Sequence, residues 1–475
     1  MLTYSFTDTG SEPMYEYLYK CMKKDIIKGV LPPGDRLPSK RTFAKNLGIS
    51  IITIENAYAQ LMAEGYIYSL PKKGYFVADI KESMPEGKKN LTMENVNLSG
   101  GQTSYLADFA SNQTDPDNFP FSTWARMIRE ILNQNRTDLM TNPPCGGILY
   151  LRQAIATHLK EFRGMVVSPE QIIVGAGTEY LYGLLIQLLG FDKKYAVENP
   201  GYQKVMQIYK SNRVSCSYVD MDESGMQTSE LEKSGADIVH LTPAHHFPTG
   251  ITMPIARRYE LLAWASRSES RYIIEDDYDS EFRLTGRPIP TLQSIDVMEK
   301  VIYINTFTKS LASTVRIGYM VLPGHLVNQF YANMNFYSCT VSNFEQYTLA
   351  RFISDGSFEK HINRMRSFYC TKRDHLLQII RSSPLNSLVT ISEEDAGLHF
   401  LMHIRTRLTD GELIRSARQE GINLSSLSQY YIDAEEPPAH TFVINYSFVK
   451  EEVMEEAVLR LYQILRKSDK INQKE

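Results

Sequence analysis

The chain has 475 residues, 43% of them hydrophobic, and a formal net charge of −4. This length exceeds what one hydrophobic core can organise, so we expect two or three globular domains, and the near-neutral charge by itself indicates no nucleic-acid or membrane partner. No apolar run approaches the ~20 residues of a membrane-spanning helix, and the first ten residues lack the pattern of a signal peptide, which together predict a cytoplasmic protein.

Composition divides the chain into two domains joined by a linker. Residues 11–80 hold ten lysines or arginines and seven acidic residues, a small basic surplus. Residues 81–106 are predicted to be a linker, because they contain few large apolar side chains and many Pro, Gly, Ser and Asn residues. Over residues 107–470, helical stretches alternate with short apolar runs such as KYAVEN and KVIYINT. That alternation is typical of an α/β domain with a parallel sheet covered by helices on both faces.

The first domain is predicted to contain a helix-turn-helix followed by a β-hairpin. A helix is expected from Met14 to Val30, and two shorter helices follow, with Ser39 and Ser50 as their N-caps. The hairpin after them carries two lysines and a glycine at its tip, which suits the phosphate backbone or the minor groove of DNA: Lys72, Lys73 and Gly74. The pattern indicates an α+β winged helix-turn-helix that binds DNA, and use of such a domain for protein contacts is the alternative.

The run GVLPPGDRLPSKRTFAKNLGISIITIENAYAQLMAEGYIYSLPKKGYFVA resembles the GntR family of winged-helix regulators. By that family's docking mode, Ser39 and Arg41 lie against the DNA backbone, and Gly74 lets the wing approach the duplex. The same mode places four residues in the major groove: Ser50, Ile51, Ile52 and Thr53. The family usually has arginine where this chain has Ile51, so the bidentate contact of an arginine with guanine is absent at this position. Ile51 could instead contact the methyl group of a thymine.

The second domain carries a lysine at the end of an apolar run. This lysine is Lys309. Thr306 and Thr308 precede it, and Arg316 stands seven residues after it. Burial and a nearby cation lower the pKa of a lysine, and the free amine can then form a Schiff base with an aldehyde. Hydroxyl and guanidinium groups would hold a phosphate on that aldehyde.

Three further motifs place ligand-binding groups at strand ends. Asp276 can pair with a protonated pyridine nitrogen, and Tyr278 can donate to a phenolic oxygen, although capping of the next helix is an alternative for the acids. Gly177 and Thr178 stand at a glycine-rich turn where a helix N-terminus can bind phosphate. Tyr202 follows another strand and can stack on a pyridine ring.

In this order and spacing the motifs resemble fold-type I pyridoxal-phosphate enzymes. Within that group the chain resembles MocR/GabR-type regulators, in which a GntR winged helix is fused to an aminotransferase-like domain of three α/β layers. The resemblance implies pyridoxal 5'-phosphate as cofactor, Lys309 as the Schiff-base lysine, Asp276 on the ring nitrogen and a homodimer. It also implies a set of residues around the phosphate: Ala176, Gly177, Thr178, Thr306, Thr308 and Arg316.

Several departures from the resemblance concern a small-molecule effector. The stretch 441–447 lacks the arginine that clamps the substrate carboxylate in aminotransferases, and a family aromatic near Asn142 is missing. Three residues are candidates for effector binding: Lys204, His246 and Gln429. His245 and His246 have no spaced carboxylate, and the five cysteines include no CxxC pair, so we expect no metal site, no disulfides and free thiols.

These features predict a bacterial transcription regulator that binds two half-sites of double-stranded DNA and senses pyridoxal phosphate, an amino acid or an amine. The alternative is an active aminotransferase. A nucleic-acid-binding scaffold that has lost its cofactor is a third possibility, disfavoured because Lys309, Asp276, Tyr278 and Arg316 are all present.

Overall fold

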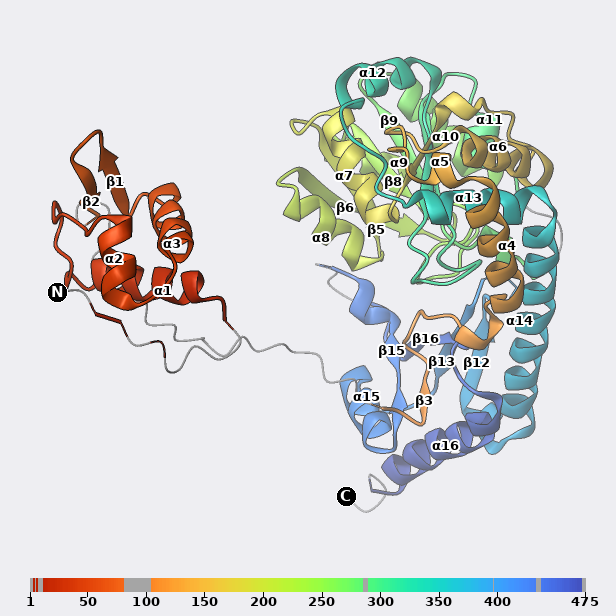
Figure 1. Cartoon of the computed structure of the whole chain (residues 1–475). Helices are drawn as coiled ribbons and strands as arrows, with labels where there is room; N and C mark the ends of the chain where they lie inside the picture. Colours follow the sequence, from red (N-terminus) through yellow and green to blue (C-terminus); the bar gives the residue numbers. More distant parts are fainter. Residues whose placement is uncertain are drawn as a thin grey trace. The chain divides into compact units, whose positions relative to one another are not determined.

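The structure is a computed structural model, and it forms two compact units, residues 1–101 and 102–475 (Figure 1). The described residues are 3–4, 6, 12–80, 104–284, 289–395, 397–432 and 437–471. Most of the expected linker, residues 81–103, lies outside them.

The first unit contains three helices and a two-stranded antiparallel sheet. Its elements are α1 (Met14–Ile27), α2 (Lys40–Leu47), α3 (Ile51–Ala63), β1 (Ile67–Leu70) and β2 (Gly74–Val77). Helix α1 ends three residues before the expected Val30, because Gly29 has a left-handed φ of 74° that stops the helix. Apolar side chains of all three helices form one core with Ile67 and Val77 of the hairpin.

The two serines cap the helices of the helix-turn-helix as expected. Ser39 Oγ accepts a hydrogen bond from the backbone N–H of Thr42 at 3.2 Å, and Ser50 Oγ accepts one from that of Thr53 at 3.1 Å. Each bond satisfies an amide that the first turn of a helix leaves unpaired. Gly48 ends α2 with φ of 66°, which lets the chain turn into α3 within two residues.

The second unit is built on an eight-stranded sheet in the order β4-β11-β10-β9-β8-β5-β6-β7. The strands are β4 (Ile172–Gly175), β5 (Lys194–Asn199), β6 (Ser215–Asp222), β7 (Gly225–Met226), β8 (Ile238–Leu241), β9 (Tyr272–Asp277), β10 (Val301–Thr306) and β11 (Gly318–Val321). Five neighbouring strands, β10, β9, β8, β5 and β6, run parallel to one another, as the sequence predicted. Strand β11 is antiparallel to both neighbours, unlike an all-parallel sheet, because residues 307–317 join it to β10 without a crossover helix.

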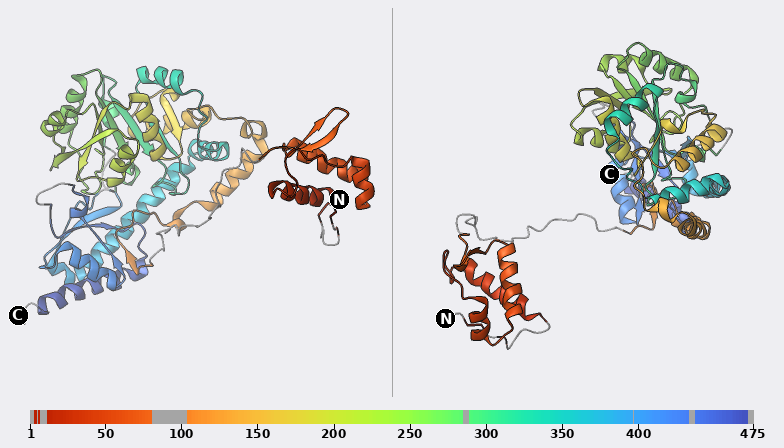
Figure 2. Two further views of the ribbon diagram at one scale, coloured as in Figure 1. Left: turned by 90° about the vertical axis from the view of Figure 1, so that its left-hand side faces the viewer. Right: turned by 45° about the horizontal axis from the view of Figure 1, so that its top comes forward.

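Helices cover both faces of this sheet and give a three-layer domain (Figure 2). The sides alternate along β10: Tyr303 packs into the core under α4, α6 and α13, whereas Ile302 and Ile304 pack under α7, α8 and α12. The helices around the sheet are α4 (Phe121–Gln134), α5 (Arg136–Leu139), α6 (Leu149–Arg163), α7 (Thr178–Leu189), α8 (Gln203–Ser211), α9 (Thr228–Ser234), α10 (Ile255–Ser266), α11 (Leu292–Ile295), α12 (Gly324–Met334) and α13 (Asn343–Ser354).

A smaller four-stranded antiparallel sheet, in the order β12-β13-β16-β15, completes the unit. Its strands are β12 (Val389–Ser392), β13 (His399–Ile404), β15 (Ser425–Ser426) and β16 (Thr441–Asn445), and its helices are α14 (Ser357–Ser382), α15 (Asp410–Gln419) and α16 (Met454–Ile471). The short strand β3 (Ala107–Asp108) pairs with β14 (Ile422–Asn423), so the segment that enters this unit packs against its C-terminal part. None of the described helices is both long and apolar enough to cross a membrane.

Candidate functional site

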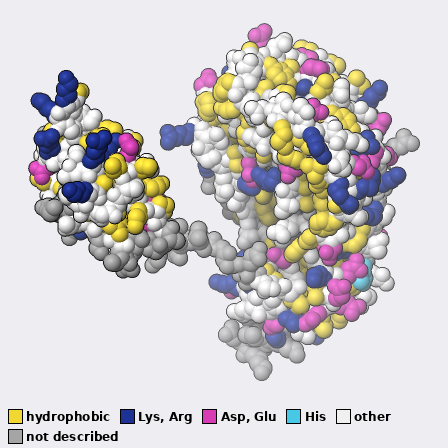
Figure 3. Space-filling model, viewed as in Figure 1, with side chains coloured by type: hydrophobic (Ala, Val, Ile, Leu, Met, Phe, Trp, Pro, Cys, Tyr) yellow, Lys and Arg dark blue, Asp and Glu magenta, His cyan; other side chains and the backbone are white. Residues whose placement is uncertain are grey.

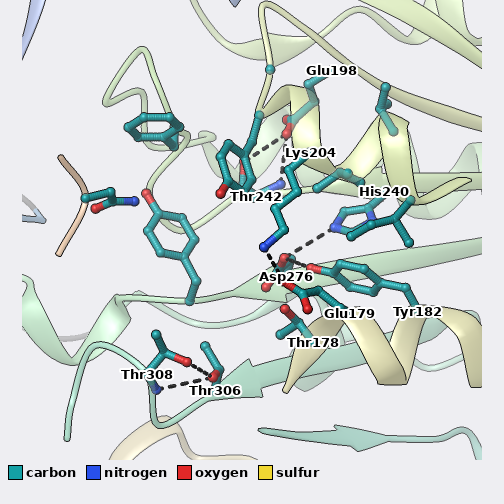
Figure 4. Close-up of a pocket in the computed structure, with 18 of the residues that line it drawn as sticks. Thr178, Glu179, Tyr182, Glu198, Lys204, His240, Thr242, Asp276, Thr306 and Thr308 are labelled. Carbon is teal, nitrogen blue, oxygen red and sulfur yellow. Dashed lines mark hydrogen bonds and ion pairs between the residues drawn. The ribbon is translucent and has the colours of Figure 1, made fainter. Parts of the chain in front are cut away.

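A cavity of about 240 Å³ opens at the carboxyl edge of the large sheet, where β9 and β10 end and α7 begins (Figure 4). This is the edge at which open α/β sheets bind ligands. The cavity is lined by the effector candidate Lys204 and by eight of the ten predicted cofactor residues: Thr178, Tyr202, Asp276, Tyr278, Thr306, Thr308, Lys309 and Arg316. Gly177 and Ala176 come just before Thr178 on the chain and are not among its lining residues.

Lys309 lies in the cavity wall with only 6% of its surface exposed. Its Nζ donates to both the backbone carbonyl and the side-chain oxygen of Asn112. Burial lowers the pKa of Lys309 to about 8, and the charge of Asp279 opposes that shift. About a tenth of this amine is therefore unprotonated at pH 7, far more than for an ordinary exposed lysine, and the neutral amine is the form that acts as a nucleophile.

Asp276 offers an unpaired oxygen at the end of β9. Its Oδ2 accepts a hydrogen bond from the hydroxyl of Tyr182 and lies 3.4 Å from His240 Nε2. Its Oδ1 is buried and has no hydrogen-bond partner in the described part of the chain. Because a buried acceptor without a donor is costly, this oxygen fits a ligand that brings a proton, such as a protonated ring nitrogen.

Tyr278 is held at the cavity by a chain of polar contacts. Its hydroxyl lies 3.4 Å from Nδ1 of His245, and that nitrogen lies 2.8 Å from Asp279 Oδ2. Burial raises the pKa of Tyr278 far above its usual range, so the phenol stays protonated and can donate to a ligand.

Tyr202 is half exposed and borders the cavity after β5. Its ring meets that of Phe247 edge-to-face, with the centroids 5.9 Å apart. The ring of Tyr202 is thereby oriented by an aromatic neighbour, an arrangement compatible with stacking on a flat ligand ring.

The hydroxyls of Thr306 and Thr308 lie 2.7 Å apart and line the same cavity as the guanidinium of Arg316. Gly177 has φ of 87°, and a Cβ there would lie 3.0 Å from Arg316 Nη2, so glycine is needed for this close approach. The amide of Ala176 already donates to Thr340 Oγ1 at 3.0 Å, which leaves it engaged rather than open to a phosphate.

One of the three expected effector residues lines the cavity. Lys204 lines the cavity, and its ammonium pairs with Glu179. His246 and Gln429 are not among the lining residues: His246 Nδ1 lies 2.7 Å from Thr249 Oγ1, and Gln429 accepts a bond from Ser425 at 3.0 Å. His246 nevertheless borders the cavity wall, because its Nε2 lies 3.5 Å from Oε2 of the lining residue Glu198, and the effector role of the three residues stays a prediction.

Other groups at the site were missed by the sequence analysis. Glu198 lines the cavity and accepts bonds from the amide and hydroxyl of Thr242 at 3.0 and 2.8 Å, and burial raises its pKa to about 8. Asn445, on the last strand β16, donates to Asn112 Oδ1 at 3.0 Å. The lysine and arginine side chains in the described lining are Lys204, Lys309 and Arg316.

In the first unit, the start of α3 presents apolar side chains to solvent. Ile51 and Ile52 are 47% and 68% exposed. Thr53 is partly buried, and its hydroxyl lies 2.8 Å from that of Ser50. The isoleucines are therefore the freest side chains for reading bases at this end of the helix.

The wing is basic and exposed, and Figure 3 shows lysine and arginine side chains standing out from the surface of this unit. Lys72 and Lys73 form the turn between β1 and β2, with Lys72 at φ of 62° and Gly74 at φ of 109°. Arg36, which the sequence analysis missed, places its guanidinium beside Gly74, with Nε 3.6 Å from where a Cβ would stand. Arg41 is exposed at the start of α2. In the part of the chain that is described, no group of His, Cys, Asp and Glu side chains is arranged to hold a metal ion.

Residues 106–461 match the family of class I and II aminotransferases, and residues 14–77 match the gntR family of bacterial regulatory proteins. The chain is 37% identical over 448 residues to the HTH-type transcriptional regulator YhdI of Bacillus subtilis, covering 94% of this chain and 95% of that protein. It is 30% identical to the probable rhizopine catabolism regulatory protein MocR of Rhizobium meliloti, covering 94% and 92%. It is 29% identical to the pyridoxine biosynthesis transcriptional regulator PdxR of Corynebacterium glutamicum, covering 86% and 87%.

Solved structures of aminotransferases share the fold of the second unit. A multiple substrate aminotransferase from Thermococcus profundus superposes with a TM-score of 0.67 at 23% identity, covering 82% of this chain and 99% of that one. A kynurenine aminotransferase from Pyrococcus horikoshii gives a TM-score of 0.66 at 23% identity, covering 77% and 92%. The fold-type I architecture expected from the sequence is thus confirmed.

Proposed function

Because the chain belongs to the MocR-type regulators of the gntR family, whose DNA-binding domain precedes an aminotransferase class I and II domain, we propose that occupancy of its cavity controls its binding to DNA. The protein is a DNA-binding transcription regulator. The proposed signal is pyridoxal 5'-phosphate, alone or with an amino acid or amine. A cofactor-related signal is supported by the relative PdxR, which is a regulator of pyridoxine biosynthesis.

Membership in the aminotransferase family implies pyridoxal 5'-phosphate as the cofactor, and the cavity residues fit it. When bound, this group supplies an aldehyde that reacts with primary amines, and a ring that withdraws electrons. Lys309 would provide the amine, and Asp276 Oδ1 would accept a hydrogen bond from the protonated ring nitrogen. Thr178, Thr306, Thr308 and Arg316 would hold the phosphate, and Tyr278 would donate to the phenolic oxygen.

One observation favours sensing over steady turnover. Of the lysine and arginine side chains in the described lining, Lys309 would serve the aldehyde, Arg316 would serve the phosphate, and Lys204 pairs with Glu179. An amino acid entering the cavity therefore finds no free bidentate cation for its carboxylate, which weakens binding of both ground state and transition state. An active aminotransferase remains the competing function.

For DNA, we propose that residues 11–80 form the reading domain and residues 107–470 the effector domain, with the chain acting in the cytoplasm. Arg41, Lys72 and Lys73 would contact phosphates, whereas Ile51 and Ile52 would meet base edges in the major groove. Ser39, Ser50 and Thr53 would act mainly by fixing the two helices, since their hydroxyls bond to neighbouring hydroxyls or to the helix amides. Gly74 would allow the close approach of the wing.

We propose a homodimer formed by the second unit. Exposed apolar side chains stand on elements that pack against one another around α13, and a partner would cover them: Phe121, Met140, Leu149 and Phe344. Exposed apolar patches of this kind commonly mark subunit interfaces. Two winged helices would then be available for two half-sites on DNA.

The proposed function is tested by measuring DNA binding with and without cofactor. The protein first selects its preferred sequence from a random DNA pool, and its affinity for that sequence is then measured across a range of pyridoxal 5'-phosphate concentrations. A cofactor-dependent change supports the proposal. Rapid turnover of common amino acids without any effect on DNA binding supports the aminotransferase instead.

A further inference from the structure

Glu179, in the first turn of α7, bridges two cations of the cavity. Its Oε2 accepts a bond from Arg316 Nη2 at 2.9 Å, and its Oε1 forms an ion pair with Lys204 (Figure 4). These two cations hold the pKa of Glu179 below its usual range, with the Lys204 contact the larger cause, so the carboxylate is charged at neutral pH.

The carboxylate sits where an incoming phosphate would find its main cation. Thr178, Thr306 and Thr308 line the same cavity as Arg316. A phosphate dianion bound there would compete with Glu179 for the guanidinium and would be repelled by the displaced carboxylate. A helix N-terminus stabilises any acidic side chain, but that effect does not account for the bond to Arg316.

Arg316 places its half-exposed guanidinium beside the turn at Gly177. Its backbone φ is 52°, in the left-handed region, and its guanidinium lies so close to Gly177 that a Cβ there would approach to 3.0 Å. Because Glu179 already bonds to this guanidinium, a phosphate that binds beside Thr178 must share the guanidinium or displace the carboxylate. Lys204, on α8, has a long flexible side chain. Its ion pair with Glu179 can therefore persist after the bond between Glu179 and Arg316 is broken.

We propose that Glu179 is a built-in competitor of the cofactor phosphate, which holds Arg316 in the empty site and is displaced onto Lys204 alone when the phosphate binds. This inference rests on the proposed cofactor site. This competition lowers the affinity of the site for the phosphorylated cofactor. The fraction of sites that are occupied then changes with the concentration of the cofactor. A sensor needs such a site, because one that is always full reports nothing.

The test compares affinities for three probes: pyridoxal 5'-phosphate, pyridoxal, which lacks the phosphate, and inorganic phosphate. Dissociation constants are measured by absorbance for the first two and by calorimetry for the third, on the full chain. Glu179→Gln removes the competing charge with little change of shape. Glu170→Gln is the matched control, because Glu170 is an exposed acid that bonds to Ser168 and is not among the lining residues of the cavity.

We expect Glu179→Gln to tighten binding of pyridoxal 5'-phosphate about fivefold, the size of a partly exposed ion pair, and to tighten inorganic phosphate in the same direction. Pyridoxal binding and the control variant should be unchanged. Lys204→Met should weaken pyridoxal 5'-phosphate, because the displaced carboxylate then has no second cation.

Unchanged or weaker binding of pyridoxal 5'-phosphate by Glu179→Gln, in a variant whose thermal unfolding matches that of the unmodified protein, overturns the inference and leaves the cofactor site intact. Equal tightening of pyridoxal also overturns it, since the effect would not concern the phosphate. If the unmodified protein binds neither pyridoxal compound, the cofactor site itself is wrong, and this inference with it.

Discussion

Asn112 accepts two hydrogen bonds from the ammonium of Lys309, one at its backbone carbonyl and one at its side-chain oxygen, although the residues stand 197 positions apart. Asn112 is itself held by Asn445 at 3.0 Å. The reactive amine is thus fixed by the segment that enters the second unit and by the last strand of its smaller sheet.

Lys309→Ala should abolish the covalent trapping of pyridoxal 5'-phosphate by borohydride, because Lys309 supplies the one lysine amine that the cavity buries in the described structure. Mass spectrometry of the reduced protein measures this. Lys300→Ala is the control, since that ammonium bonds to the carbonyls of Ser268 and Glu269 outside the cavity. Retention of the adduct in Lys309→Ala would contradict the assignment.

The rate of covalent attachment should depend on pH with a midpoint near the Lys309 pKa of about 8. Only the neutral amine attacks an aldehyde, so the rate should fall about tenfold for each pH unit below the midpoint and level off above it. Stopped-flow absorbance at several pH values gives the profile. A midpoint near the ordinary lysine value of about 10.4 would mean that burial does not tune this amine.

Asp276→Asn should weaken cofactor binding by about 2 kcal/mol, because it removes the charged partner of a protonated ring nitrogen. Tyr182→Phe removes only the donor to Asp276 Oδ2 and should cost about 1 kcal/mol. Equilibrium titration by absorbance separates the two. Equal effects of both substitutions would argue that Asp276 has a structural role alone.

The sequence was sufficient to place the residues that follow strands. Lys309, Asp276 and Thr178 stand at the ends of apolar runs or at a glycine-rich turn, and parallel strands bring such ends to one edge. Their partners could not be predicted in the same way. Tertiary packing brings Asn112, Tyr182 and His240 to the site. The periodicity of apolar residues along the chain does not specify which distant polar group will contact a given carboxylate or amine.

Tertiary packing, which a local sequence pattern does not specify, also explains why strand β11 and the hydrogen bonds of two effector candidates were not predicted. Strand β11 was not anticipated, because its apolar run is short and follows a loop rather than a helix. His246 and Gln429 were placed by resemblance to a family pattern, but their side chains are held by Thr249 and Ser425. A resemblance fixes the position of a residue in the chain and leaves its rotamer and hydrogen bonds to the packing around it.

Lys73→Ala should weaken binding to all DNA sequences alike and reduce the salt dependence of binding by roughly one unit, since it removes one phosphate contact. Fluorescence anisotropy at several salt concentrations measures both quantities. A loss of affinity confined to one sequence would place Lys73 against bases instead.

Ile52→Ala, at the exposed start of α3, should instead change which base pair is preferred while leaving the salt dependence unaltered. Selection from a random DNA pool with each protein shows the preference. An identical selected sequence for the variant would mean that Ile52 does not contact bases.

Turnover of common α-amino acids with a keto-acid acceptor should stay far below an ordinary enzyme rate of ~1 per second, because the described cavity lining offers no free arginine for the carboxylate. A coupled assay of keto-acid formation measures this. Turnover at the ordinary rate would favour the aminotransferase over the sensor.

The most direct test of the central claim is the affinity of the protein for its selected DNA with and without pyridoxal 5'-phosphate, measured side by side for the unmodified chain and Lys309→Ala. We predict that the cofactor shifts the dissociation constant of the unmodified protein for DNA severalfold and leaves that of Lys309→Ala unchanged. If DNA affinity is the same with and without cofactor in the unmodified protein, although borohydride trapping proves the site is filled, the cofactor alone is not the signal. If adding a panel of amino acids and amines to the loaded protein also leaves the DNA affinity unchanged, the cavity does not control the DNA-binding domain.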